Sequence, residues 1–597
     1  MLAHCRMQGF VIGRKRGGDV AQGDIEGKVV FWCSDRRRRR LPAPGSAAGD
    51  GGLYNGRRRL PQPPHFPAHD ANEPAVGFAL PAERLAAFQR AGKIKIRNID
   101  SIRHFCYKLA RGTLVTLNKE VNTIHFVGIC GTAMASVAAM CRELDHTVTG
   151  SDENVYPPMS TFLESRDIRI VSGYRESNLD HRPGLVVIGN AMKRGNPEVE
   201  RLLDERWNYC SLPELVREFF IRGNHSIVIA GTHGKTTTTS LLAWVLESAG
   251  LNPGFLIGGI PENFGGGGRA AAQAGTPVPP PRNGGAGVPA CGRFFITEGD
   301  EYDTAFFDKR SKFVHYLPDT VILNNIEFDH ADIFPDLAAV KRAFRQLVAV
   351  VPRRGLIIAN GEDANVREVI LGSQCPCRFF TKADFDGFTI PIAGDHNQRN
   401  AAAVAVCAAG LGLSRDQIQQ GFSTFRGVKR RMEVRGEAAG VTVIDDFAHH
   451  PTAIAETIRA IRAKYPQRRL WALFEPRTNT TRRNIFQREL ADSLALADGV
   501  FIARVDRLNE LNENERLQPE QIIESLRRAG KVAEYSSNTE QIVAHLVPQL
   551  RDRDVVAVFS NGKFDGVHEK LLARLRVRGD CAPQNAVQSP SHIESAA

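Results

Sequence analysis

The strongest chemical signal in the sequence is a glycine-bounded turn that carries a lysine and three threonines. Gly231-Thr-His-Gly-Lys-Thr-Thr237 follows the apolar stretch 226–230 and precedes a segment with helical spacing. Glycines let backbone N–H groups approach phosphate oxygens, and a helix N-terminus adds a favourable dipole. Lys235 can neutralise the β and γ phosphates, and the Thr236 hydroxyl can bind Mg²⁺. The turn predicts a nucleotide site, although Ile229 stands where the full Walker pattern has its first glycine.

Two groups of acidic and amide side chains follow later predicted strands. The first comes after 294–297 and contains Glu298, Asp300, Glu301 and Asp303. The second lies at the end of 320–325 and contains Asn325, Glu327, Asp329 and His330. Taken alone, each group fits solvated loop charge as well as a metal site. Because the carboxyl ends of parallel strands meet at one edge of a sheet, both groups should face the bound phosphates, and together with the turn they predict a Mg²⁺ site.

A second pair of glycine turns lies nearer the start of the folded region. Gly128-Ile-Cys-Gly131 closes the apolar stretch 123–129, and Gly150-Ser-Asp152 closes the stretch 147–152. In a nucleotide-binding fold, the first turn approaches the ligand closely and an acid after the second strand binds a hydroxyl or a base edge. The spacing is not Gly-x-Gly-x-x-Gly, so a tight structural turn explains it equally well.

The segments that position these residues alternate between strand and helix patterns, which indicates an α/β fold with parallel sheets. Three such units follow one another, at 121–222, 223–412 and 413–577. The predicted strands are 123–129, 147–152, 185–189, 226–230, 294–297, 320–325, 356–360, 441–446, 469–475, 500–503 and 555–560. The predicted helices are 132–144, 235–250, 337–350, 399–411, 452–464 and 484–496. The stretch 265–292 is dense in Gly, Pro and Ala, and we expect a flexible surface insertion there.

Composition and charge set the class of protein. The 597 residues are 42% hydrophobic and 24% charged, and no apolar run reaches the roughly 18 residues that a membrane helix requires. The chain has a net charge of +11; residues 1–120, with 22 Lys and Arg against 10 Asp and Glu, contribute +12, and the remaining residues contribute −1. We expect this leader and the tail 578–597 to be disordered, with at most a weak helix at 81–89. The arginine runs fit an acidic partner or a solvated tail, and the neutral remainder predicts no nucleic-acid binding.

The cysteines indicate a reducing environment. Eleven of them occur at irregular spacing, unlike the disulfide framework of a small secreted domain. No apolar segment follows the first basic residues, as it does in a secretory signal. Cys375-Pro-Cys377 lacks a second pair at zinc-site spacing, and we interpret it as incidental. We therefore expect a cytoplasmic protein.

Together, these motifs resemble in order and spacing the Mur ligases of peptidoglycan synthesis. The resemblance covers about 124–572 and rests on the turn 231–236, Glu298 with Asp300-Glu301, Asn325–His330, His396-Asn397 with Asn400, Arg430-Arg431, and Asp445-Asp446-Phe-Ala-His449-His450-Pro451. It implies a Rossmann-like N-terminal domain that binds a UDP-sugar, a P-loop ATPase-like central domain and a Rossmann-like C-terminal domain. It also implies an ADP-forming ligase that makes a C–N bond through an acyl phosphate, with ATP and Mg²⁺.

The resemblance also implies roles for particular residues. It implies catalytic roles for Lys235, Glu298 and His330, and a Mg²⁺ site at Thr236, Glu298 and His330. ATP would contact Gly231, Thr232, His233, Gly234, Lys235, Thr236, Thr237, Asn325, Asn397 and Asp446, with Asn400 and either Arg430 or Arg431 nearby. The UDP-sugar would contact Gly128, Gly131, Thr132, Asp152 and Asn190. The base that deprotonates the attacking amine is left open among His330, His449 and a nearby acid.

The acceptor substrate can be narrowed within the family. The stretches 154–159, 188–196, 302–316 and 475–479 are similar to members that join the murein tripeptide L-alanyl-γ-D-glutamyl-meso-diaminopimelate to UDP-N-acetylmuramate in peptidoglycan recycling. The alternative within the family is ligation of L-alanine to UDP-N-acetylmuramate. Two further alternatives are a nicotinamide oxidoreductase built on the first unit and a regulatory binder that retains the fold without turnover.

The sequence departs from the family pattern at four places. Gly299 replaces the usual alanine after Glu298, the stretch 265–292 is long, and the stretch 372–394 is short. Lys563 and Asp565 stand where the family tends to have glycine. If these two backbones require positive φ, the side chains destabilise the turn.

Overall fold

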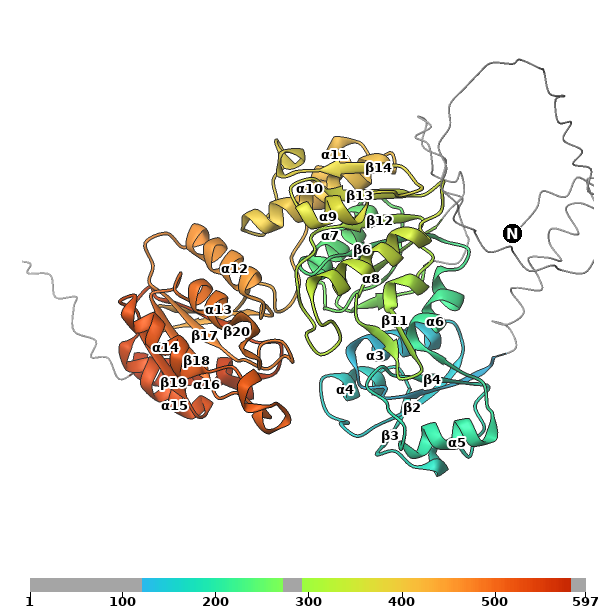
Figure 1. Cartoon of the computed structure of the whole chain (residues 1–597), viewed down its shortest axis with the longest axis horizontal. Helices are drawn as coiled ribbons and strands as arrows, with labels where there is room; N and C mark the ends of the chain where they lie inside the picture. The colour runs from blue at the N-terminus through green and yellow to red at the C-terminus, as the bar shows by residue number, and fades with distance from the viewer. Residues whose placement is uncertain (1–120, 272–292, 581–597) are drawn as a thin grey trace, which may run out of the picture. The chain divides into compact units, whose positions relative to one another are not determined.

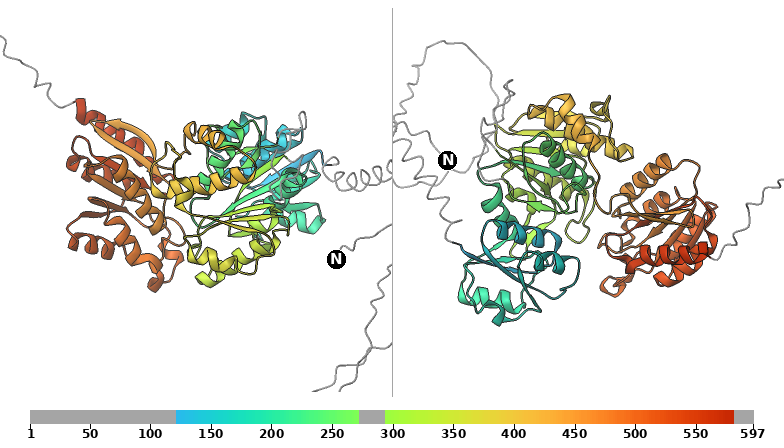
Figure 2. Two further views of the ribbon diagram at one scale, coloured as in Figure 1. Left: turned by 90° about the horizontal axis from the view of Figure 1, so that it is seen from above. Right: turned by 180° about the vertical axis from the view of Figure 1, so that it is seen from behind.

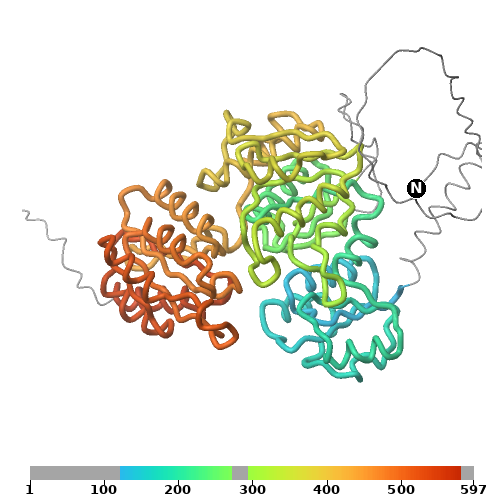
Figure 3. Tube along the Cα trace, in the orientation of Figure 1, coloured from blue at the N-terminus to red at the C-terminus, as the bar shows by residue number. Residues whose placement is uncertain are grey.

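The computed structural model describes residues 121–271 and 293–580 (Figure 1). The predicted leader with its helix at 81–89, most of the predicted insertion, and the tail from 581 lie outside these residues. Three parallel or mostly parallel sheets follow one another along the described chain, each built from one continuous stretch (Figure 3). The predicted α/β class with three units is therefore confirmed. Among the described residues, no helix has both the length and the apolar character needed to cross a membrane.

The first sheet has the strand order β3-β2-β1-β4-β5, and all of its strands run parallel. Its strands are β1 (Thr123–Val127), β2 (Thr147–Asp152), β3 (Arg169–Ser172), β4 (Leu185–Ile188) and β5 (Tyr209–Ser211). Its helices are α3 (Thr132–Glu143), α4 (Met159–Glu164), α5 (Pro197–Glu205) and α6 (Leu212–Val216). Small residues let α3 pack closely, and its side chains from Met134 to Cys141 are buried. The turn from β1 into α3 therefore lies at the carboxyl edge of the sheet.

The second sheet has the order β14-β13-β12-β6-β9-β7-β8. Its strands are β6 (His225–Ala230), β7 (Gly254–Leu256), β8 (Gly268–Arg269), β9 (Phe294–Gly299), β12 (Thr320–Leu323), β13 (Leu356–Asn360) and β14 (Cys377–Phe380). Its helices are α7 (Lys235–Ser248), α8 (Leu337–Val350), α9 (Ala364–Val369), α10 (Asp395–Gly410) and α11 (Arg415–Ser423). A separate hairpin joins β10 (Asp303–Ala305) to β11 (Asp308–Ser311). Every residue of β6 is buried, as expected for a strand covered on both faces.

The third sheet has the order β15-β16-β20-β17-β18-β19, with only β15 antiparallel. Its strands are β15 (Glu433–Ala438), β16 (Val441–Asp446), β17 (Leu470–Phe474), β18 (Gly499–Ala503), β19 (Val532–Ser536) and β20 (Val555–Phe559). Its helices are α12 (Pro451–Lys464), α13 (Gln487–Leu494), α14 (Pro519–Arg528), α15 (Thr539–Leu546) and α16 (Val567–Asp580). One apolar cluster joins the sheet to α12, α13 and α14, and another joins the sheet to α15 and α16. Figure 2 draws this part of the chain in orange and red.

The sequence predicts the wrong starting residue for two segments, the flexible insertion and the disordered tail. The predicted flexible insertion begins too early, because Gly268–Arg269 forms β8 and pairs antiparallel with β7. A Cβ on Gly268 would lie 2.8 Å from the sulfur of Met140, so this glycine packs directly on α3. The predicted tail also begins too early, because α16 continues to Asp580.

Candidate active site

The glycine-bounded turn joins β6 to α7, and buried neighbours fix its shape. Gly234 adopts φ +81°, and a Cβ there would lie 2.5 Å from Oδ1 of Asn400. The Asn325 side chain accepts a hydrogen bond from His233 N at 2.7 Å and donates one to His233 O at 3.2 Å. Asn325 therefore holds the loop that leads into the helix N-terminus. This geometry leaves the start of α7 suited to an anion.

Lys235 is held by one acid of the first acidic group. Its ammonium donates to Gly231 O at 2.8 Å and to Glu301 Oε2 at 2.9 Å. The two side chains are 12% and 3% exposed. Burial raises the pKa of Glu301, but Lys235 and His330 outweigh it and bring the pKa to about 2. Burial alone would lower the pKa of Lys235, but Glu301 outweighs burial and raises it. Lys235 therefore remains positively charged beside the loop.

Glu298 pairs with the hydroxyl that follows the lysine. Thr236 Oγ1 donates to Glu298 Oε2 at 3.0 Å, and Gly258 N donates to Glu298 Oε1 at 2.6 Å. Burial and the nearby Asp300 raise the pKa of Glu298 to about 7. A hydroxyl and a carboxylate side by side at a phosphate loop are the oxygen donors that Mg²⁺ prefers, so these two residues fit the ion.

His330 lies on the other side of this arrangement. Its Nε2 is 3.2 Å from Glu301 Oε1. Burial lowers the pKa of His330, but Glu301 outweighs burial and raises it. Of the three residues expected around Mg²⁺, the structure thus joins Thr236 to Glu298 directly and joins His330 to the partner of Lys235.

The turn after β1 is clamped by Asp152. The carboxylate accepts from Cys130 N through Oδ2 and from Asn154 N through Oδ1, both at 2.9 Å. Gly128 adopts φ +85°, and its N–H donates to Ser151 O at 2.8 Å. Gly131 caps the N-terminus of α3. Both carboxylate oxygens of Asp152 therefore accept from backbone N–H groups. An acid at this position can serve to stabilise the turn as well as to bind a ligand.

The chain between α11 and α12 contributes two arginines and a buried acid. Arg431 Nη2 donates to Thr236 Oγ1 at 3.3 Å. Arg430 turns away, to Asp445 Oδ2 at 3.2 Å and Ser560 O at 2.6 Å. Asp446 accepts from Met432 N and Ala448 N, both at 2.8 Å. Asp446 therefore braces the turn that carries Arg431, and Arg431 is the arginine that reaches the phosphate loop.

One cavity of about 2980 Å³ collects these residues. Every site residue expected from the sequence lines it except Gly231, whose carbonyl instead accepts from Lys235. Asn397 and Asn400 line it from α10, where Asn397 Nδ2 donates to Ala393 O at 2.7 Å.

Sequence reasoning missed Thr480 as a site residue. Its hydroxyl is 2.8 Å from Asp329 Oδ1, and it accepts from Ala331 N at 3.3 Å. Burial raises the pKa of Asp329, but His449 outweighs it and lowers the pKa well below its usual value. Thr480 comes directly after the stretch 475–479, and that adjacency is the one signal that could have found it.

Comparisons with known proteins agree with this architecture. Residues 123–222 match the Mur ligase family catalytic domain, 229–388 the Mur ligase middle domain, and 430–562 the Mur ligase glutamate ligase domain. The UDP-N-acetylmuramate–L-alanyl-gamma-D-glutamyl-meso-2,6-diaminoheptandioate ligase of Escherichia coli (strain K12) is 40% identical over 483 residues, which cover 77% of this chain and 99% of that protein. The UDP-N-acetylmuramate–L-alanine ligase of Solibacter usitatus is 30% identical over 486 residues, covering 76% and 96%.

A solved structure shows the same likeness in three dimensions. The crystal structure of a murein peptide ligase from Psychrobacter arcticus matches with a TM-score of 0.58 at 36% identity, over 76% of this chain and 98% of that one. Each of the three matched domains contains one of the three sheets, and one relative is 40% identical along nearly its whole length. On this evidence the chain belongs to the Mur ligase family.

Proposed function

We propose that this protein is an ATP-dependent ligase that joins the murein tripeptide L-alanyl-γ-D-glutamyl-meso-diaminopimelate to UDP-N-acetylmuramate. The observation that carries the proposal is the 40% identity to a ligase of that name, along 99% of its length. The phosphate loop supports it, because Lys235 and the Thr236–Glu298 pair lie on one cavity with the turn after β1. The 30% identity to an L-alanine ligase makes L-alanine the alternative acceptor.

The chemistry requires activation of a carboxylate. Its negative charge repels a nucleophile, and oxide is a poor leaving group. Transfer of the γ-phosphoryl group of ATP to the lactyl carboxylate gives an acyl phosphate, and attack by the alanyl amine then expels phosphate. Protein groups contribute chiefly by positioning the reactants and stabilising charge. Lys235 supplies positive charge at the loop, and Arg431 extends it from the chain before β15.

Thr236 and Glu298 would bind Mg²⁺, which neutralises phosphate charge when bound. The raised pKa of Glu298 fits this role, since an adjacent cation favours the carboxylate form. His330 fits charge stabilisation better than proton removal, because Glu301 raises its pKa. We assign the base to His449, whose Nε2 lies 3.7 Å from Asp329 Oδ2 and which lines the cavity.

The remaining substrate assignments belong to the same proposal. The nucleotide would lie near Asn325, Asn397, Arg431 and Asp446, and the UDP-sugar near Gly128, Gly131, Thr132, Asp152 and Asn190, all of which line the cavity. Because ATP and UDP-sugars are cytoplasmic metabolites, we propose that the reaction takes place in the cytoplasm.

The experiment that tests the acceptor is a coupled assay of ADP release. The protein is supplied with UDP-N-acetylmuramate, ATP and Mg²⁺, and with either the tripeptide or L-alanine. We expect kcat/KM to be at least about 10-fold higher with the tripeptide, equivalent to about 1.4 kcal/mol of transition-state binding. Equal or higher kcat/KM with L-alanine would overturn the tripeptide assignment and leave the ligase chemistry standing.

A further inference from the structure

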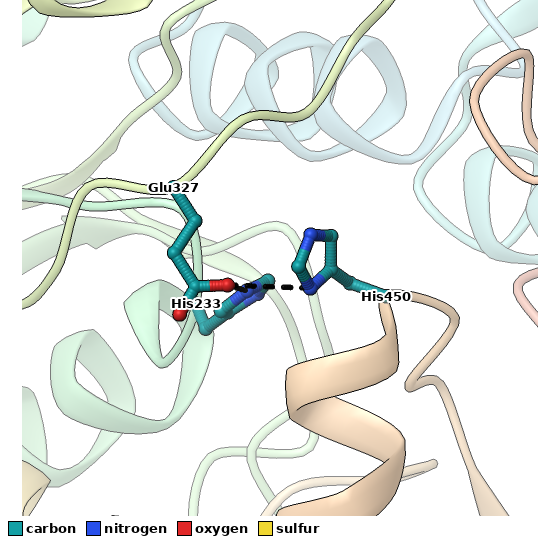
Figure 4. Close-up of side chains that lie close together, drawn as sticks. All are labelled: His233, Glu327 and His450. Carbon is teal, nitrogen blue, oxygen red and sulfur yellow. Dashed lines mark hydrogen bonds and ion pairs between the residues drawn. The ribbon is translucent and has the colours of Figure 1, made fainter. Parts of the chain in front are cut away.

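Three side chains to which the proposed mechanism gives no chemical step meet at the edge of the cavity, and one of them, His233, belongs to the loop expected to contact ATP. His233 Nε2 and His450 Nδ1 each lie 3.4 Å from the same oxygen, Glu327 Oε2. Figure 4 shows the two imidazoles and the carboxylate directed toward one another. We call His233, Glu327 and His450 the His–Glu–His cluster. Among the described residues it is a group of potential metal ligands whose atoms all lie within 4.8 Å of one another.

Each member comes from a different element. His233 belongs to the phosphate loop before α7, Glu327 to the segment after β12, and His450 caps the N-terminus of α12. Residues 217 positions apart in the chain are thus brought to one point. The two histidine rings are 4.6 Å apart between centroids. Such a meeting of two imidazoles and one carboxylate is the donor set of many zinc sites.

The hydrogen bonds around His450 fix which nitrogen faces the cluster. Its Nε2 is 3.2 Å from the carbonyl of Phe328, which can only accept, so Nε2 carries the proton. Its Nδ1 therefore carries the lone pair; it lies 3.4 Å from Glu327 Oε2 and accepts a long hydrogen bond of 3.3 Å from Thr452 N, which a bound metal ion would replace. A metal-binding histidine commonly donates its other N–H to a backbone carbonyl in this way. Thr452 Oγ1 also donates to Glu327 Oε2 at 2.7 Å, which orients the carboxylate.

The contact between His233 and Glu327 is a long hydrogen bond in the ligand-free protein, and the spacing of the cluster also fits a metal site. Contacts of 3.4 Å are longer than the usual 2.7–3.2 Å of an N–H···O bond. Ligand atoms held about 2.0–2.1 Å from a tetrahedral zinc ion lie about 3.3 Å from one another. The observed separations of 3.4 Å match this distance between ligand atoms. Nitrogen donors also set the cluster apart from the oxygen donors Thr236 and Glu298, which suit Mg²⁺.

We propose that the His–Glu–His cluster binds a divalent transition-metal ion of the zinc class, as a second metal site separate from the Mg²⁺ site of the nucleotide. His233, Glu327 and His450 are three ligands, and the fourth position faces the cavity that all three residues line. The bound ion ties the N-terminus of α12 to the phosphate loop. It therefore stabilises the packing of α12 against the segment that follows β12.

The test measures metal binding in the absence of ATP and of both substrates. The full-length protein is stripped with a chelator and titrated with Zn²⁺ against a chromophoric zinc indicator. It is then titrated with Co²⁺, whose visible absorption is much stronger in four-coordinate than in six-coordinate sites. We expect one Zn²⁺ site per chain, a four-coordinate Co²⁺ spectrum, and a rise in melting temperature with Zn²⁺.

Variants assign the signal to the cluster. Glu327→Gln and His450→Ala should each weaken Zn²⁺ binding at least about 10-fold and remove the Co²⁺ spectrum. The matched control is His545→Ala, because His545 pairs with Glu534 on α15 and β19, away from the cavity. It should bind Zn²⁺ as the wild type does.

Two results would overturn the proposal. One is a wild-type protein that shows no four-coordinate Co²⁺ spectrum. The other is equal Zn²⁺ affinity in the wild type and Glu327→Gln, whose near-identical shape preserves the fold. The 17 histidines and 11 cysteines of the chain provide other weak sites for Zn²⁺. The test therefore depends on the difference in Zn²⁺ affinity between the wild type and the variant. No outcome depends on ligase activity, so failure here leaves the proposed reaction untouched.

Discussion

At the scale of the residue, Lys235 has two roles, and a single substitution of this lysine affects both of them. Its ammonium faces the expected phosphates and also neutralises the buried Glu301. We expect Lys235→Ala to lower kcat for ADP release by about 100-fold or more, because one aimed charge is worth about 3 kcal/mol in such a transition state. The same change leaves Glu301 unpaired, so the melting temperature should also fall.

A double substitution distinguishes the two roles. Lys235→Ala with Glu301→Gln removes the unpaired charge, so it should recover melting temperature without recovering kcat. Lys341→Ala is the matched control, because Lys341 forms an ion pair with Glu368 on the outside of α8 and does not line the cavity. Full activity in Lys235→Ala would contradict the role assigned to this lysine.

The raised pKa of Glu298 predicts how the stability of the folded protein changes with pH. Burial and Asp300 raise its pKa to about 7 in the folded, ligand-free protein, compared with 4.5 for an ordinary glutamate. Between these values the folded state binds more protons than the unfolded state. The contribution of Glu298 to stability is therefore present below the unfolded pKa and is lost as pH rises through about 7.

The measurement is the melting temperature of the wild type and Glu298→Gln without nucleotide or Mg²⁺. As pH is raised from about 5 to about 8, we expect the wild type to lose stability relative to the variant. Other ionisable groups affect both proteins alike, so only the difference matters. Parallel melting profiles over this range would show that the carboxyl is not shifted.

At the scale of the element, Gly150 in β2 shows how tightly the first sheet packs on its turn. A Cβ there would lie 2.5 Å from Ile129 Cδ1 and 2.8 Å from the carbonyl oxygen of Phe126. Since a backbone oxygen cannot move without disturbing β1, we expect Gly150→Ala to destabilise the protein by about 1–3 kcal/mol. Thermal unfolding measures the effect.

Gly410, the last residue of α10, is the control for this substitution. A Cβ at Gly410 meets nothing within 4 Å, and alanine favours helix more than glycine does. Gly410→Ala should be neutral or slightly stabilising. An equal loss of stability at both glycines would mean that the crowding at Gly150 has no energetic effect.

Buried strands were predictable from the sequence, and edge strands were not. All of β6 and β12 is apolar or buried, so a short apolar run between turn residues identifies each strand. The edge strand β15 contains exposed, charged residues, and the edge strand β19 mixes an exposed valine with a half-buried glutamate, so neither has a continuous apolar run. These strands form because they pair with a neighbouring strand, and the local sequence has no pattern that predicts this pairing.

The same limit applies inside the site. Four acids lie within 298–303, and their types do not reveal which one faces the lysine. Glu298, near the end of β9, faces Thr236, and the chain after β9 turns Glu301 toward Lys235, 66 residues away. The motif thus located the group of acids, and only the fold could assign the partners.

At the scale of the whole molecule, the two departures near the end of β20 have different consequences. Asp565 adopts φ +46°, as glycine would, and its carboxylate accepts from Thr539 Oγ1 and Lys570 Nζ, both at 2.6 Å. Aspartate tolerates this region better than most residues. Lys563 has φ −82°, so the expectation of positive φ is wrong there.

Lys563 instead makes a contact across the molecule. Its ammonium lies 3.9 Å from the ring centre of Tyr156, in the segment between β2 and α4. Neither residue lines the large cavity. The contact joins the turn after β20 to the domain expected to bind the UDP-sugar, and a cation over an exposed ring contributes about 0.5–1 kcal/mol. Because acyl phosphates hydrolyse, a contact that holds these two domains together should favour ligation over water attack.

A double-mutant cycle on this pair tests that role. Lys563→Met and Tyr156→Leu should each lower kcat/KM for ligation about 2- to 5-fold, and the double variant should lose no more than either one. Lys563→Arg should retain wild-type kcat/KM, because a guanidinium also stacks on an aromatic ring. Arg488→Ala, on the exposed face of α13, is the control for general loss of surface charge. Additive losses in the double variant would mean that the two side chains act independently, and the contact between them would then have no part in ligation.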